Sequence, residues 1–165
     1  MDTLVRPIAA QYALSNGILN TSVKDLSDAE AKRRSRNGEG PSIAWTIGHL
    51  SNWRVKMLAL LGQPRENLFA AQFDGTAATD GSDYPSLAEM MESWNALCID
   101  FASAMEKTSG ATMDGPMPGS GPHDEKKIMD TIGFFAWHEA YHIGGVGHIR
   151  KELGRKAISE LVRGQ

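Results

Sequence analysis

Apolar residues recur at three- and four-residue spacing along most of the chain, and the clearest run follows Pro85. This spacing places the apolar side chains on one face of a helix. We therefore expect Pro85 to open a helix that ends before Thr108. Its apolar stripe consists of Leu87, Met90, Met91, Trp94, Leu97, Cys98, Phe101 and Met105. Core packing accounts for these residues, so we interpret Cys98 as a core residue and not as a nucleophile.

Two further helices are predicted before this one. The first covers residues 2–19, where Gly17 weakens the end of the pattern. The second begins after Ser42, a residue type that caps helix N-termini, and reaches about Leu61, where Gly62 closes it. Between them, the segment LSDAEAKRR predicts a short additional helix.

A fourth long helix is predicted near the C-terminus. Asp124 is its expected N-cap, and it runs to about Leu153, before Gly154. The tail RKAISELVRGQ adds one or two further helical turns.

The connection over residues 63–84 is long, and the chain shows neither an alternating strand pattern nor an internal repeat. Four long helices without a sheet indicate a four-helix bundle. We expect an all-α fold, a single domain over residues 1–165, with a long crossover between the second and third helices.

Composition narrows the class of protein. The chain has 165 residues and a net charge of −3, which gives no electrostatic reason to bind nucleic acid or an anionic membrane. Its apolar runs are too short for a membrane span or for the core of a signal peptide. One cysteine, Cys98, excludes an intramolecular disulfide, so we expect a cytoplasmic protein.

The last long helix carries two histidines at a spacing suited to metal binding. His138 and His142 lie about 40° apart around a helix and one turn apart along it. Imidazole pairs of this kind bind zinc, nickel, iron or copper. The same face carries Phe134, Phe135, Gly145 and Ile149. A pair of buried, hydrogen-bonded core histidines explains this pattern equally well.

A third histidine favours the metal interpretation. His49 lies midway along the second helix, with Trp45 and Trp53 on the same face. Three inward imidazoles that converge on one ion leave coordination positions open for water or substrate. Trp45 and Trp53 fit core packing as well as a role in the pocket. Glu139 lies about 60° from His142 around the helix. This position suits a catalytic base or a residue that contacts the ligands from behind. A solvated or interhelical carboxylate would fit it equally well.

A competing motif uses the same residues. The segment HEAYHIGGVGH matches the metzincin protease pattern, in which His148 is the third ligand and Glu139 the general base. On a continuous helix, however, His148 lies about 120° around the axis and roughly 9 Å along it from His142. The chain also lacks the strand-rich half and the later methionine of these proteases, so we expect His148, like His123, to lie on the surface or in a loop.

Four glycines interrupt the same helix: Gly133, Gly144, Gly145 and Gly147. Each costs about 1 kcal/mol in helix propensity relative to alanine. Either the close approach of a neighbouring helix or the need to leave space for a ligand would explain these glycines. We favour close packing against a neighbouring helix.

Taken together, the helices and histidines resemble the DinB-like family of four-helix-bundle metalloproteins over nearly the whole chain. The segment SIAWTIGHLSNW resembles the family's second-helix block, and WHEAYHIGGVGHIRKELG resembles its closing block. The resemblance implies that His49, His138 and His142 hold zinc or nickel and that the chain forms a homodimer. Gly145 departs from the family pattern, which often has glutamine there.

Characterised relatives include thiol-dependent transferases and a mycothiol-dependent maleylpyruvate isomerase, so the resemblance implies a metal-dependent enzyme acting on a small molecule. A low-molecular-weight thiol would then be a second cofactor. A hydrolase that uses metal-bound hydroxide is an alternative reaction. A non-catalytic metal-binding bundle with a structural or stress-response role is the alternative outside enzymes.

Overall fold

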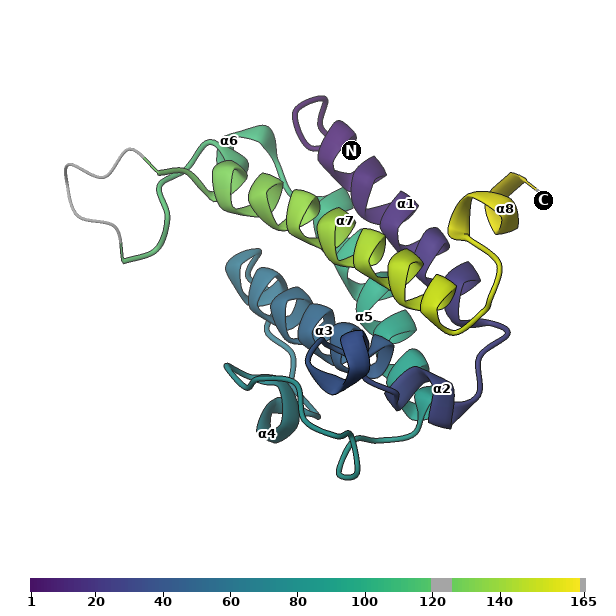
Figure 1. Cartoon of the computed structure of the whole chain (residues 1–165). Helices are drawn as coiled ribbons and strands as arrows, with labels where there is room; N and C mark the ends of the chain where they lie inside the picture. The colour runs from purple at the N-terminus through teal and green to yellow at the C-terminus, as the bar shows by residue number, and fades with distance from the viewer. Residues whose placement is uncertain (120–125, 164–165) are drawn as a thin grey trace.

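The computed structural model describes residues 1–119 and 126–163, and within these ranges the chain forms helices and no strand. In chain order the helices are α1 (Arg6–Val23), α2 (Asp28–Lys32), the 3-10 turn η1 (Arg36–Gly38), α3 (Ile43–Leu60), α4 (Ala70–Phe73), α5 (Leu87–Lys107), α6 (Gly110–Met113), α7 (Ile128–Glu152) and α8 (Ile158–Arg163). Four of these helices are long and pack into a bundle, which confirms the predicted fold class (Figure 1). Of the helices described, none is both long and apolar enough to cross a membrane.

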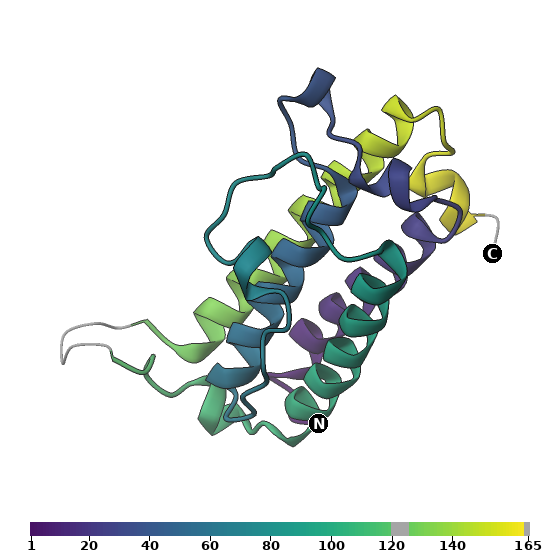
Figure 2. The same ribbon diagram turned by 90° about the horizontal axis from the view of Figure 1, so that it is seen from below.

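The long helices form a ring in which α1 and α3 each pack against both α5 and α7 (Figures 1 and 2). Helices α1 and α7 run in one direction, and α3 and α5 run in the other. At one end the Tyr12 hydroxyl donates to the Ile132 carbonyl, and at the other Arg150 pairs with Asp25. Because α3 and α5 are consecutive long helices that run parallel, the chain needs the long crossover that the sequence predicted.

The stripe predicted on α5 forms the centre of the core. Most of its members are buried: Met90, Trp94, Leu97, Cys98, Phe101 and Met105. The remaining two, Leu87 and Met91, are partly buried at its edge. The apolar periodicity therefore identified both the helix and the face that packs inward.

The helix start predicted after Ser42 is confirmed, whereas α5 begins at Leu87, two residues after the predicted Pro85. The Ser42 side chain accepts a hydrogen bond from the Trp45 amide at the start of α3. Ser86 and Glu89 form a reciprocal capping box at the start of α5. Gly62, with φ +76°, follows the end of α3 in the left-handed conformation that favours glycine.

Helix α1 differs from its prediction at both ends. It begins at Arg6 because the Asp2 side chain instead accepts hydrogen bonds from the Leu4 and Gly110 amides, which holds the first residues in a turn. It continues to Val23 because Gly17 keeps a helical backbone and the residues after it include Leu19, which is completely buried. A glycine ends a helix only where the chain turns left-handed, and Gly17 does not.

A close apolar contact joins the crossover to α3. Phe73, on α4, is buried and lies directly over Gly48. A Cβ atom at Gly48 would be 2.4 Å from the Phe73 ring, so only glycine fits there. Tyr84 packs against the other part of Phe73, with ring centroids 4.8 Å apart. This contact anchors the crossover beside His49.

The last long helix ends where the sequence predicted, but its N-cap is Lys127 and not the predicted Asp124. Helix α7 ends at Glu152, and Gly154 follows with φ +72°. Helix α8 supplies the predicted extra turns. At the start of α7 the Asp130 carboxylate accepts from the Lys127 amide, and the predicted cap Asp124, like His123, lies outside the described residues.

Candidate metal centre

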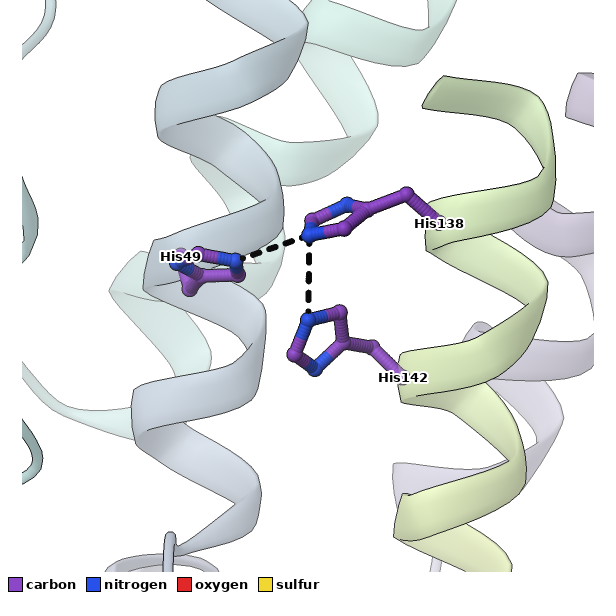
Figure 3. Close-up of side chains that lie close together, drawn as sticks. All are labelled: His49, His138 and His142. Atoms are coloured by element: carbon purple, nitrogen blue, oxygen red, sulfur yellow. Dashed lines mark hydrogen bonds between the residues drawn. The ribbon is translucent and has the colours of Figure 1, made fainter. Parts of the chain in front are cut away.

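Three histidines from two helices meet on one side of the bundle (Figure 3). His49 comes from α3, and His138 and His142 lie one turn apart on α7. The Nε2 atoms of His49 and His138 are 3.2 Å apart, and those of His138 and His142 are 3.1 Å apart. One ligand atom from each ring lies within 4.8 Å of the other two. The packing of α3 against α7 therefore assembles the predicted group of histidines.

These separations fit a single ion. Tetrahedral zinc–imidazole bonds of about 2.0–2.1 Å place ligand nitrogens roughly 3.3 Å apart. Both of these contacts join Nε2 atoms, so the nitrogens of the three rings surround one small volume. The remaining nitrogen of His138, Nδ1, is buried and has no hydrogen-bond partner within the described chain. A contact between two imidazole nitrogens is a hydrogen bond only if one of them carries the proton, whereas a cation accepts the lone pairs of all three, so these residues suit a cation.

The surroundings keep the three rings neutral. Burial lowers the pKa of His49 to about 4, with smaller contributions from His138 and Lys56. Burial also lowers the pKa of His142 to about 4, helped by the other two histidines, and lowers the pKa of His138. Only a neutral imidazole offers a metal-binding lone pair, so all three are prepared for a ligand role at neutral pH.

Two tryptophans hold the histidine rings in place. Trp45 stacks on His49 with centroids 4.7 Å apart and planes 15° apart. Trp53 meets the edge of His49 at 6.3 Å and stacks on Phe135 at 4.3 Å. Both tryptophans therefore pack against the histidines. The two roles expected for them, core packing and a place in the pocket, are the same contact here.

The apolar face predicted around the α7 histidines is wrong at one position. Phe134 is 52% exposed, whereas Phe135 is partly buried and Ile149 is buried. His138 lies at the edge of the buried face, and Phe134, four residues earlier, falls about 40° further out. The histidine side of α7 is therefore a boundary between core and solvent.

His148 does not join the cluster. Helix α7 runs without a break from Ile128 to Glu152, through the glycines at which the metzincin motif would have to turn. The His148 side chain is 72% exposed, and its Nε2 atom lies 3.3 Å from the Glu152 carboxylate. The protease interpretation therefore lacks its third ligand, and the surface position expected for His148 is confirmed.

Glu139 points away from the histidines and into the bundle. It is 2% exposed, and its two carboxylate oxygens accept from Arg54 at 2.7 Å each, with a third contact of 2.9 Å from Nε. Burial raises the pKa of the Glu139 carboxyl, and the Arg54 guanidinium opposes that rise. The observed role is that of an interhelical carboxylate, and a role as catalytic base stays a prediction.

Arg54 is the site neighbour that the sequence analysis missed. Its guanidinium lies 4.6–4.8 Å from the ring centroids of Tyr12, Trp94 and Phe101 and donates to the Asn16 side chain. A signal existed, because Arg54 interrupts the buried apolar stripe Ile47, Leu50 and Leu58 at helical spacing. A lone charge within such a stripe predicts a buried partner.

Cys98 lies beside this pair and is a core residue, as predicted. Its sulfur is 3.8 Å from the Arg54 guanidinium, and burial raises the pKa of the thiol to about 12. A thiol with so high a pKa is protonated at neutral pH and is a poor nucleophile.

The expectation of close packing at the α7 glycines is largely wrong. A Cβ atom at Gly133, Gly144 or Gly145 would meet no other atom within 4 Å. Close packing occurs only at Gly147, where a Cβ would lie 3.1 Å from Ile158 of α8. The alternative explanation, clearance for a ligand, therefore fits Gly145, which lies on the histidine side of α7.

Comparison with known proteins adds one match. Residues 11–146 match the family model described as the DinB superfamily, a range that includes all three histidines. No curated protein matches the chain.

Proposed function

The chain belongs to the DinB superfamily, and we propose that it is an enzyme that uses one divalent metal ion to act on a small molecule. His49, His138 and His142 would hold the ion. Zinc and nickel both suit three imidazole ligands.

One observation carries the proposal: the site has three protein ligands and stands partly open to solvent. Within the described residues, the group of metal-binding side chains contains the three histidines and no fourth member, and each of the three is partly exposed. Structural zinc sites are typically closed by four protein ligands, whereas catalytic sites have three and leave a position for water or substrate. The geometry therefore favours catalysis over a purely structural metal.

The chemistry follows from charge. Three neutral imidazoles leave a bound ion its full positive charge, which acidifies a coordinated water or thiol and polarises a carbonyl group. Trp45 and Trp53 hold the His49 ring in place and keep water from one side of it. A thiol-dependent transferase or isomerase is our first choice of reaction, and a hydrolase is the second.

The direct test is metal content. Elemental analysis should find about one zinc or nickel ion per wild-type chain and none in the His49→Ala variant. Equal metal in both proteins would refute the assignment of ligands.

A second measurement tests whether small thiols bind at the ion. In cobalt-substituted protein, added small thiols should change the visible spectrum, because they occupy the open position. An unchanged spectrum across a panel of thiols would exclude thiol chemistry and favour the hydrolase or the structural role.

We also propose that the chain forms a homodimer through the outer face of α7. This face exposes three large aromatic side chains in successive turns, Phe134, Trp137 and Tyr141. Clustered exposed apolar groups of this kind mark contact surfaces. Sedimentation equilibrium should give a dimer for the wild type and a weaker dimer for Trp137→Ser. A monomeric wild type would refute this proposal without affecting the metal site.

A further inference from the structure

A positively charged hollow lies at the end of the bundle where α3 begins and α7 ends. Its volume is about 800 Å³, and Lys32, Arg33, Arg34, Arg36, Asp80 and Glu152 supply its charged side chains. Segments far apart in the sequence build it: the end of α2, η1, the crossover and the last turn of α7 (Figure 2).

The hollow has more positive than negative charge, although the whole chain has a net charge of −3. Four cationic side chains face two carboxylates, and although Lys32 is paired with Asp28, the three arginines still outnumber Asp80 and Glu152. Arg33 donates to the Glu152 carbonyl and Arg34 to the Gly40 and Glu39 carbonyls, and none of the three arginines forms an ion pair among the residues described. Their charges are therefore available to an anion.

The backbone that carries Arg36 is held in an unusual shape. Arg36 and Asn37 have φ values of 50° and 54°, in the left-handed region that non-glycine residues rarely adopt. The Ser35 amide and hydroxyl both donate to the Pro41 carbonyl and close the loop around them. Strain of this kind persists where the surroundings impose it, and it is concentrated at ligand sites.

The hollow and the histidines lie along one side of α7. His138, Gly145 and Glu152 are seven residues apart, which places them on one stripe that drifts by only about 20° per step. Gly145, midway, would have open space around a Cβ atom. From His142 to Glu152 the helix rises roughly 15 Å, the length of a small organic molecule.

We propose that this hollow binds the oxyanion end, a carboxylate or phosphate, of the small molecule whose other end reaches the histidines. Arginine suits the task because its planar guanidinium donates two parallel hydrogen bonds to either group. The bare backbone at Gly145 leaves room for the ligand between the two ends. The assignment of the far end to a metal rests on the proposed function, whereas the oxyanion site does not.

The test compares thiols with and without a charged end. Straight-chain mercaptocarboxylic acids and mercaptoalcohols of matched length are titrated into cobalt-substituted protein, with the visible spectrum as the readout. In the wild type, the acid of matching length should bind about tenfold more tightly than the alcohol. Arg33→Gln and Arg36→Gln should each reduce this preference and leave the affinity for the alcohol unchanged.

Arg65→Gln is the matched control, because Arg65 is an exposed arginine paired with Asp100 beyond the opposite end of α3. It removes the same charge and should leave the preference intact. Equal affinities for acid and alcohol in the wild type, or an equal loss in Arg65→Gln, would overturn the proposal.

A metal-free experiment separates this proposal from the proposed function. Inorganic phosphate and acetate are titrated into metal-free protein and followed by amide chemical shifts. Shifts at Arg33, Arg36 and Asn37 that disappear in Arg36→Gln would support the oxyanion site even if the chain bound no metal. No shift at these residues with either anion would overturn it, whatever the metal content.

Discussion

Helices α3 and α7 build two polar clusters of opposite character. Arg54 and Glu139 are almost completely buried, and each charge has its partner. The three histidines are partly exposed, and the buried Nδ1 atom of His138 has no partner within the described chain. A fully paired cluster holds helices together, whereas an incompletely paired one at the edge of the core is prepared for a ligand.

On α7 the two clusters use neighbouring residues. His138 and Glu139 are adjacent, and a helix turns about 100° per residue, so one side chain reaches the solvent boundary and the other the bundle interior. The distinction between them can be tested by asking which cluster, when altered, costs stability and which costs ligand binding.

The largest expected effect is on the buried pair. Glu139→Ala should destabilise the metal-free protein by about 3–5 kcal/mol, because it leaves the Arg54 guanidinium buried without its carboxylate. Urea unfolding measures this loss. Replacing both partners, as Arg54→Met with Glu139→Leu, should recover much of the stability. If Glu139→Ala instead stayed stable and lost activity, Glu139 would belong to the site as a base.

Metal should stabilise the protein only through the histidine cluster. At a free metal concentration of about 100 times Kd, wild-type stability should rise by about 2.7 kcal/mol. His49→Ala should lose this gain while keeping its metal-free stability within about 1 kcal/mol, and His148→Ala should keep the gain. The opposite pattern in the two variants would restore the protease-like ligand set.

The crossover contact tests how tightly α3 is packed beside His49. Gly48→Ala should cost about 1–3 kcal/mol, because its Cβ would overlap the Phe73 ring. Combining it with Phe73→Leu should reduce that cost relative to the sum of the single changes, as thermal unfolding would show. Additive losses would mean that the two residues are not coupled.

Gly145→Ala should have the smallest effect and the opposite sign. Its Cβ would meet no atom within 4 Å, so the better helix propensity of alanine should stabilise α7 by up to about 1 kcal/mol. Metal content should not change. Destabilisation would show that a packing partner occupies the space beside Gly145, and Gly133→Ala serves as the control on an equally open position of the same helix.

Local patterns predicted most of the fold because local physics determines it. The capping serine Ser42 and the left-handed Gly62 mark the two ends of α3 through hydrogen bonds to nearby residues. The spacing of the apolar residues on α5 was enough to predict which side chains are buried in the core. The start of α1 was missed because Asp2 bonds to Gly110, more than a hundred residues away, and no local pattern records that contact.

The sequence by itself determined that His138 and His142 share one face of α7, because helix geometry fixes residues four apart. It also placed His49 on the inner side of another helix. Only the tertiary structure decided that His49 meets them, that Arg54 neutralises Glu139, and that Gly145 faces open space. These outcomes depend on how α3 and α7 pack and on where the bundle surface falls, and both are set by contacts between residues far apart in the chain.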